Sequence, residues 1–412
     1  MLIKNARILT PGQLIENGWI KIYGSSILGV GSDDELTEIY LHDDVIDAQG
    51  QLVLPGNICA HTHFYGAFSR GMPISGNPPD AFPNILKKLW WNLDKSLDAD
   101  AIFYSALVCL VEAIRYGTTT LVDHHASPNF IQGSLDILEK AVFATGLRVC
   151  LSYEVSDRDG EMRCNEGIDE NLRFITKCST NPDERVAAMF GLHASLTLSD
   201  KTLEKIQKFA SNNFGFHMHA AEHNIDELDC IKKHGTRVVN RFDKYGLLNN
   251  RSILAHAVHI DDNEMEIIRS RGCWVSHQPR SNMNNAVGLP KIEYMNELGI
   301  KVIFGNDGFS NAMWQEWKAA YLGHKLLNSD PRSMSADLIA KIAMQNNGIF
   351  ASKIFGRKIG SIEADAAADL IFVDYKPFTD LTIFNLPWHI VFGIDESMIR
   401  ATMCAGNFLM KD

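Results

Sequence analysis

Long hydrophobic runs, runs of basic residues and closely paired cysteines are all missing from this sequence of 412 residues. The longest apolar stretch, around 101–111, is shorter than the about 20 residues that a membrane-spanning helix needs. Basic residues adjoin one another at most in pairs and the formal net charge is −11, so a nucleic-acid backbone and an anionic membrane are disfavoured as partners. With 46% apolar and 22% charged residues, the composition is that of a folded globular protein.

The eight cysteines form no CxxC pair, which predicts buried free thiols in a reducing compartment. Residues 1–7 lack the apolar core of a signal peptide. We therefore expect a cytoplasmic protein that acts on a small molecule, without a nucleic-acid or membrane partner. Whether it forms a homo-oligomer is left open.

Eight apolar runs that end in polar residues alternate along the chain with segments of helical periodicity. The runs are 52–63, 118–125, 147–154, 186–194, 215–222, 252–259, 273–279 and 301–308. Near-continuous apolar strands separated by helices imply a parallel sheet that is covered on both faces. Eight such units predict an α/β fold, a (β/α)8 TIM-like barrel, whose active site lies at the carboxyl ends of the strands.

The two ends of the chain follow a different pattern, with short alternating β runs in 1–51 and again after about 360. Because chain termini often lie close together, we expect both ends to form one small β-sandwich. The predicted domains are therefore 1–55 plus 361–412 for the sandwich and 56–360 for the barrel. The connection 64–100 is long for this fold, which predicts a lid over the barrel mouth.

Eleven of the fifteen histidines lie on or beside the ends of the predicted strands. His61 and His63 are two residues apart in a strand, so both imidazoles share a face and can bind one ion. His219 ends the fifth strand and Asp307 the eighth. Three histidines and one aspartate leave a coordination position open for water, which is the pattern of a catalytic site for zinc or a similar ion.

Several of these motifs together resemble the amidohydrolase superfamily. They are LPGNICAHTH at 54–63, GTTTLVD at 117–123, HAAE at 219–222, AH at 255–256, SN at 281–282 and GND at 305–307. They are most similar to the branch that contains cytosine and guanine deaminases and triazine chlorohydrolases. The segments 63–65, 69–71, 89–91, 123–128 and 280–285 are similar to the SsnA group of aminohydrolases, which is associated with selenium-dependent hydroxylases.

The resemblance implies metal ligands at His61, His63, His219 and Asp307, a proton shuttle at Glu222, and at His256 a group that polarises the attacked centre or the hydroxide. Asp307 can also accept the proton of the attacking water. His217 shares a strand face with His219 and is the rival ligand. We prefer His219 because His217 lies deeper in the strand and lacks the three-residue step to Glu222.

Five further residues are candidates for substrate binding: His193, Arg70, His125, Ser281 and Asn282. His193 can equally be a hydrogen-bonded neighbour of the site, and Arg70 can equally form an ion pair in the lid. His124 and His125 point to opposite faces of their strand, so at most one of them reaches the site. Glu154, at the end of the third strand, is a weaker candidate for a substrate contact or a ring hydrogen bond.

The fourth predicted strand, 186–194, contains no lysine, which disfavours a two-metal site bridged by a carboxylated lysine. We expect one divalent metal ion per chain. Zinc is preferred, while iron and manganese stay open because cellular supply as well as affinity decides between them.

These features predict a mononuclear metal-dependent aminohydrolase that deaminates an amino-substituted N-heterocycle, such as a purine or a pyrimidine, and releases ammonia. Hydrolytic dechlorination, or hydrolysis of a cyclic amide or amidine at the same site, is the alternative within enzymes. A non-catalytic factor that holds a metal or cofactor for the maturation of selenium-dependent hydroxylases is the alternative outside them.

Overall fold

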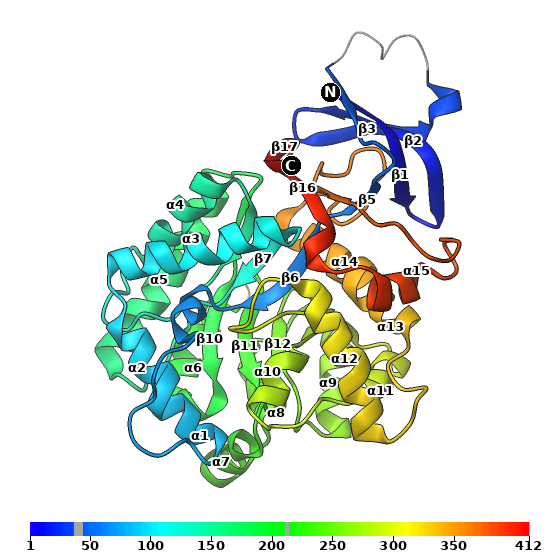
Figure 1. Cartoon of the computed structure of the whole chain (residues 1–412). Coiled ribbons are helices and arrows are strands. Elements are labelled where there is room, and N and C mark those ends of the chain that lie inside the picture. The colour runs from blue at the N-terminus through cyan, green and yellow to red at the C-terminus, as the bar shows by residue number, and fades with distance from the viewer. Residues whose placement is uncertain (37–43, 211–213, 412) are drawn as a thin grey trace.

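The computed structural model describes residues 1–36, 44–210 and 214–411. Residues 37–43 and 412, which belong to the predicted terminal domain, and 211–213 lie outside the described residues. Figure 1 shows a body of strands surrounded by helices and, beside it, a sheet in which the blue and red ends of the chain lie together. Among the described residues, no helix combines the length and the hydrophobicity needed to cross a bilayer.

The strands of the body form two parallel sheets, which follow the order of the chain. One has the order β6-β7-β8-β9 and the other β10-β11-β12-β13-β14. Their bounds are β6 (Asn57–Thr62), β7 (Thr118–Asp123), β8 (Arg148–Leu151), β9 (Val186–Ala188), β10 (Phe190–Ala194), β11 (Phe216–Ala220), β12 (Ile253–His256), β13 (Trp274–His277) and β14 (Lys301–Phe304). Each of the eight predicted runs contains at least one of these strands, and β9 and β10 share the fourth.

Backbone hydrogen bonds continue across both edges between these two sheets. At one edge, Val155 N donates to Gly191 O over 3.2 Å, and His193 N donates to Val155 O over 3.0 Å. At the other, Asn306 N and Asp307 N donate to His61 O over 2.9 and 3.1 Å. The end of β14 is thereby held against the end of β6.

A glycine is required at this second edge because the two backbones approach closely. A Cβ atom on Gly305 would lie 2.6 Å from the carbonyl oxygen of His61, well inside van der Waals contact. His63 N also donates to Asp307 O over 2.9 Å. The sequence motif GND at 305–307 therefore places the Asp307 carboxylate beside the two histidines of β6.

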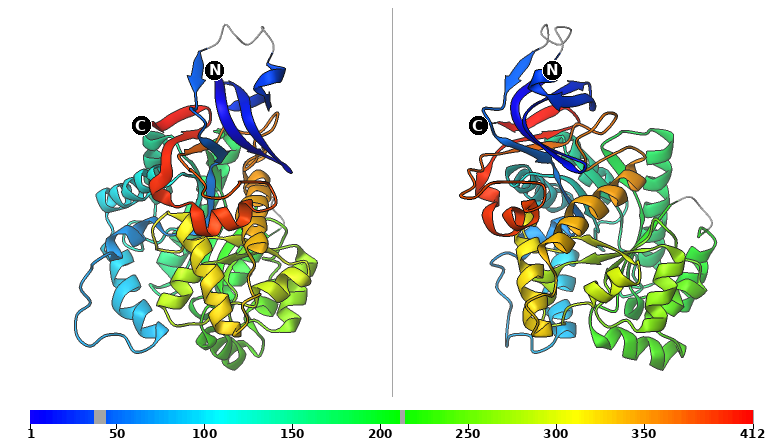
Figure 2. Two further views of the ribbon diagram at one scale, coloured as in Figure 1. Left: turned by 45° about the vertical axis from the view of Figure 1, so that its right-hand side comes forward. Right: turned by 90° about the vertical axis from the view of Figure 1, so that its right-hand side faces the viewer.

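Helices cover the outside of the strands, as the views in Figures 1 and 2 show. The longer helices are α3 (Ala99–Arg115), α4 (Ser134–Thr145), α5 (Glu161–Thr180), α6 (Asp200–Gln207), α7 (Asn224–His234), α9 (Asp262–Arg271), α12 (Met313–Asn328) and α14 (Asn347–Phe355). Shorter ones are α1 (Phe82–Ile85), α2 (Trp91–Leu93), α8 (Val238–Lys244), α10 (Pro279–Asn284), α11 (Ile292–Glu297), α13 (Ala336–Ala340) and α15 (Leu386–Trp388). The α9 helix begins with a capping box, in which Asp261 and Glu264 satisfy each other's backbone N–H groups.

Inward-pointing side chains fill the barrel below the strand ends. Trp274 and Phe350 pack edge to face there with ring centroids 5.3 Å apart, within a cluster of small and branched apolar residues. The opposite faces of the strands pack against the helices in a second, larger core. All eight cysteines are free thiols and seven of them are buried, as the sequence predicts.

Both ends of the chain pair in one sheet with the order β17-β16-β15-β5-β1-β2-β3, and β4 pairs with β1. The bounds are β1 (Leu2–Thr10), β2 (Gln13–Tyr23), β3 (Ser26–Ser32), β4 (Val45–Asp47), β5 (Leu52–Pro55), β15 (Leu370–Val373), β16 (Ile399–Cys404) and β17 (Asn407–Lys411). The two ends meet where β5 runs antiparallel to β15. The first predicted run is thus divided at Gly56, with β5 in this terminal sheet and β6 in the barrel.

A buried ion pair joins the barrel to the terminal sheet. Arg148 begins β8 and is fully buried, and its Nε lies 2.9 Å from Oδ2 of Asp369, the residue before β15. Asp369 Oδ1 also accepts a hydrogen bond from Ala405 N over 2.7 Å. One carboxylate therefore ties together a barrel strand and two segments of the C-terminal tail.

We expect Asp369→Ala to lower the free energy of unfolding by about 3–5 kcal/mol, because it leaves the Arg148 guanidinium buried without its charge partner. Asp330→Ala, which removes a partner from the exposed Arg332, is the matched control and should cost at most about 1 kcal/mol. Urea unfolding followed by tryptophan fluorescence measures both. Equal losses in the two variants would contradict the linking role of Asp369.

Candidate metal centre and active-site pocket

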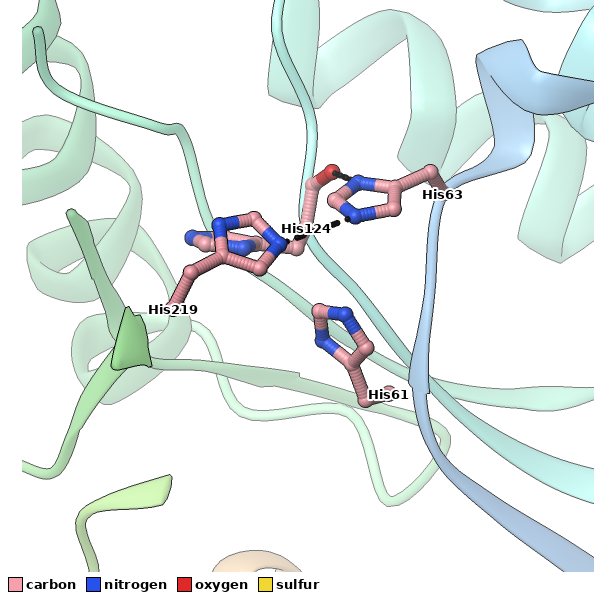
Figure 3. Close-up of side chains that lie close together, drawn as sticks. All are labelled: His61, His63, His124 and His219. Carbon is pink, nitrogen blue, oxygen red and sulfur yellow. Dashed lines mark hydrogen bonds between the residues drawn. The ribbon is translucent and has the colours of Figure 1, made fainter. Parts of the chain in front are cut away.

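Four side chains from three strand ends converge at the carboxyl-terminal mouth of the barrel. Nε2 of His63 lies 2.9 Å from Oδ1 of Asp307 and 3.2 Å from Nε2 of His219. Nε2 of His61 lies 3.3 Å from the same Asp307 oxygen. Figure 3 shows the imidazoles of His61, His63 and His219 around a common centre, with the His124 ring beside them.

The second ring nitrogen of each of these histidines has its own partner outside the centre. His61 Nδ1 lies 2.7 Å from Nε2 of His217, His63 Nδ1 donates to the carbonyl oxygen of His124, and His219 Nδ1 donates to the carbonyl oxygen of His193 over 3.1 Å. Such partners fix the tautomer, so the Nε2 lone pairs face the centre.

The donor set suits a divalent metal ion. Three imidazole nitrogens and one carboxylate oxygen are the ligands that zinc and related ions take in catalytic sites. Nε2 of His61 is buried and accepts no hydrogen bond from any described residue, which fits a lone pair kept for an ion. Burial lowers the pKa of His61 to about 4, so this ring is in the neutral, metal-binding form at physiological pH.

His217 lies behind the centre rather than in it. It contacts the outer nitrogen of His61, stacks on His124 with ring centroids 4.2 Å apart, and lies 3.5 Å from the hydroxyl of Ser152. The geometry therefore favours His219 over His217 as the ligand from β11. His124 comes close enough to His61, His63 and His219 to act as a further donor, a placement that sequence reasoning missed.

Glu222 and His256 lie next to this donor set. His256 Nε2 is 3.6 Å from Glu222 Oε2, and His256 Nδ1 lies 2.9 Å from the side-chain amide of Asn282. Burial, reinforced by the nearby Asp307 carboxylate, raises the pKa of Glu222 well above its usual value. Glu222 is thereby suited to hold a proton at neutral pH.

The backbone is strained at two of these positions. His256 and Asp307 have φ angles of 74° and 57°, in the left-handed region that residues other than glycine rarely adopt. Ser281 holds Asp307 from one side, because its hydroxyl donates to Oδ2 over 2.5 Å. Strain that is kept in place by such contacts is typical of functional sites.

The pocket in front of this centre is walled by aromatic residues of the predicted lid, 64–100. Tyr65, Phe82, Trp90 and Trp91 line it, together with His193 and Glu222 from the barrel. Tyr65 and Trp90 contact edge to face with centroids 6.1 Å apart, and Phe82 stacks on His223. Planar aromatic walls of this kind are suited to bind a flat ring.

The structure divides the five candidate substrate residues. His193 lines the pocket and its Nδ1 lies 2.8 Å from the Thr197 hydroxyl. Ser281 and Asn282 contact Asp307 and His256, so their positions suit holding those residues in place. Arg70 and His125 are absent from the pocket lining: Arg70 pairs with Glu112 over 2.6 Å, and His125 lies 2.9 Å from the Ser127 hydroxyl.

The sequence pattern indicated one acidic residue of the pocket only weakly and another not at all. Glu154 lines the pocket with Oε1 3.2 Å from His63 Nδ1, although the sequence suggested it only weakly through its place at a strand end. Asp94 comes from the lid and pairs with Arg158 at the pocket wall. No strand-end signal marks Asp94, because a lid has no periodic pattern that ties it to the site.

Comparison with known families decides what kind of protein carries this centre. The Amidohydrolase family matches residues 52–409, which include every residue of the donor set. The chain belongs to the Amidohydrolase family. This confirms the superfamily inferred from the motifs, and the relatives agree with its deaminase branch.

One relative of this amidohydrolase is the 5'-deoxyadenosine deaminase of Methanosarcina mazei, 30% identical over 420 residues that cover 100% of this chain and 93% of the relative. An adenosine deaminase from Xanthomonas campestris with bound zinc superposes with a TM-score of 0.85 at 19% identity, covering 100% of this chain and 92% of that one. Guanine deaminase from C. acetobutylicum, with bound guanine, gives 0.85 at 18%, covering 99% of each. At such identities the structural likeness shows the fold, a TIM-like barrel.

We expect His219→Ala to abolish tight metal binding, whereas His217→Ala should keep one ion per chain and weaken its binding by about 10–100-fold through the lost contact to His61. Metal content after dialysis against a graded series of chelator concentrations measures both effects. Retention of the ion in His219→Ala together with its loss in His217→Ala would reverse the ligand assignment.

Proposed function

We propose that this amidohydrolase is a mononuclear metal-dependent enzyme that deaminates an amino-substituted N-heterocycle by hydrolysis and releases ammonia. The observation that carries the proposal is the convergence of His61, His63, His219 and Asp307 next to a proton-holding Glu222. Zinc is the preferred ion, as in the similar adenosine deaminase structure, and iron or manganese would suit the same donors.

A divalent ion in this donor set would supply Lewis acidity and lower the pKa of a water molecule to about 7. The chain supplies the rest of the chemistry. Asp307 is held in the carboxylate form, because its contacts with the imidazoles of His61 and His63 outweigh its burial and keep its pKa well below the usual value. It can therefore accept the proton of the attacking water.

Glu222 acts as the proton shuttle. It enters protonated and donates that proton to the ring nitrogen next to the attacked carbon. The resulting carboxylate takes the proton of the added hydroxyl and passes it to the leaving amino group, and the proton accepted by Asp307 then restores Glu222. His256 orients the attacking oxygen through Nε2, which is buried, lies 3.6 Å from Glu222 and has no hydrogen bond to any described residue. Asn282 at Nδ1 of His256 sets the direction in which this ring presents Nε2.

The substrate is a small planar molecule. The relatives named 5'-deoxyadenosine deaminase support a purine or a close analogue, and the aromatic walls Trp90, Trp91 and Tyr65 would hold its ring. His193 is proposed as a substrate contact at the pocket wall. A purely metal-holding or maturation role is disfavoured, because neither Glu222 nor His256 is needed to bind an ion.

We also propose the finer architecture expected from the sequence: a closed (β/α)8 barrel over 56–360 and a β-sandwich from 1–55 and 361–412. The hydrogen bonds from 306 and 307 to His61 O support closure of the barrel. A cytoplasmic location stays a prediction. The sequence left open whether the protein forms a homo-oligomer, and size-exclusion chromatography with light scattering tests this.

We expect Glu222→Gln to keep one metal ion per chain and to lose turnover by at least about 100-fold, because an amide cannot carry the shuttled proton. The measurement is ammonia release from aminopurines, aminopyrimidines, triazines and guanidino compounds. The exposed Glu161, which pairs with Lys201, offers Glu161→Gln as a charge-matched control that should keep full activity.

Two outcomes would contradict the proposal. Full ammonia release by Glu222→Gln would contradict the assignment of Glu222 as the proton shuttle. Release of chloride or opening of a cyclic amide without ammonia would assign the same site to another leaving group, and product analysis in the same reactions separates these cases.

A further inference from the structure

Carboxylates dominate the charge of the pocket. Five line it: Asp94, Glu154, Glu222, Asp226 and Asp307. Among the residues that the structure describes, no lysine or arginine belongs to the pocket lining. A ligand that enters therefore meets acidic groups, imidazoles and aromatic rings, and no basic side chain longer than histidine among the described lining residues.

Four of the five carboxylates have an identified partner or task. Asp94 pairs with Arg158, and Asp226 accepts hydrogen bonds from the backbone N–H groups of Ala221 and Leu196 over 3.0 and 2.9 Å. Asp307 belongs to the metal donor set. Glu222 accepts a hydrogen bond from the Asn285 amide over 3.2 Å and is the proposed proton shuttle.

Glu154 is the exception. Its side chain is 3% exposed, and its polar neighbours are imidazoles: His63 Nδ1 at 3.2 Å, His124 Nδ1 at 3.4 Å and His193 Nε2 at 3.8 Å. The Nδ1 proton of His63 already goes to the carbonyl oxygen of His124. Oε1 of Glu154 is buried without a hydrogen bond, and no described lysine or arginine forms an ion pair with it.

A buried carboxyl oxygen without a hydrogen-bond donor is unfavourable, and a donor that enters the pocket would stabilise it. His193 does not fill that role well, because its Nε2 is 3.8 Å from Glu154 and its other nitrogen is taken by Thr197. Both groups face the pocket, so a substrate can reach them together. The missing donor would then come from the substrate.

We propose that Glu154 and His193 form a subsite for an N–C–N edge of the substrate, an amidinium, guanidinium or protonated aminoheterocycle whose N–H groups donate to the carboxylate. Anionic substituents are rejected by the same charge. This inference rests on the proposed deaminase function and narrows its substrate class to cationic or donor-rich planar compounds.

A second metal ion is the competing occupant, because Glu154, His193 and His219 also lie close enough to share one. Nε2 of His219 is already directed at His63 and Asp307 in the first donor set. Glu154 and His193 alone leave two protein ligands, fewer than the three that catalytic zinc sites use. The geometry therefore favours a substrate group over a second ion.

Three probes of nearly equal shape test the subsite: benzamidine, benzamide and benzoate, which are cationic, neutral and anionic. Calorimetric titration of the metal-loaded enzyme should show benzamidine binding at least about tenfold tighter than benzamide, and benzoate weakest, because hydrogen bonds to a charged group are the stronger kind. Glu154→Gln should remove most of this preference, while Glu154→Asp should keep it in part. Glu161→Gln is the surface control and should bind all three probes like the parent.

Several results would overturn the subsite. They are no measurable benzamidine binding, benzoate binding as tightly as benzamidine, and an unchanged order of the probes in Glu154→Gln. Two ions per chain that fall to one in Glu154→Gln would assign the carboxylate to a second metal instead. If Glu154→Gln also loses the first metal ion, its probe affinities no longer report on the subsite alone. The order of the three probes on the parent enzyme and on Glu154→Asp then decides whether the subsite exists.

The binding series does not depend on turnover, so the two proposals can fail separately. If no compound releases ammonia, the deaminase proposal is contradicted, while the measured order of affinities for the three probes remains valid evidence for the subsite. Ammonia release with an equal preference for anionic and cationic substrates would keep the deaminase and remove the Glu154 subsite.

Discussion

The site depends on one backbone junction, where the end of β14 is hydrogen-bonded to the end of β6 through the carbonyl oxygen of His61. This junction brings a carboxylate that lies more than two hundred residues away in sequence into contact with both histidines of the HTH motif. Gly305 makes the approach possible because it has no side chain to fill the gap. Asp307 then accepts a left-handed backbone conformation that the neighbouring strand and Ser281 maintain.

Around this junction the barrel buries many polar side chains, and four of its imidazoles have a partner at the outer ring nitrogen. The outer nitrogens of His61, His63, His219 and His256 contact His217, His124, His193 and Asn282 respectively. Buried polar groups are tolerated only when they are satisfied in this way. The inner atoms are left free for an ion and a substrate, which is why the unpartnered Glu154 carboxylate carries information about the ligand.

Much of the placement of the site residues could be predicted from the sequence, because strands and helices impose a regular spacing on the side chains that share a face. Alternation in a strand places His61 and His63 on one face, and the three-residue step from His219 to Glu222 separates a ligand from a proton shuttle. The sequence left alternatives open where the chain leaves regular structure. Arg70, in the lid, pairs with Glu112, and beyond the end of β7 it is His124 rather than His125 that joins the histidine cluster. Neither outcome follows from a period of two or of 3.6 residues.

The sequence by itself determined the class of fold, the terminal pairing of the chain ends and the residue types that can bind a metal, because these follow from hydrophobic periodicity and from motif spacing. Only the tertiary structure showed that His217 lies behind the donor set that includes His219 and that Ser281 and Asn282 contact Asp307 and His256. Only the tertiary structure also showed five carboxylates around one pocket, with no lysine or arginine among its described lining residues. The physical reason is that such choices depend on distances of a few ångströms between side chains from different strands and a lid. Those distances are set by packing of the whole barrel, which no local stretch of sequence encodes.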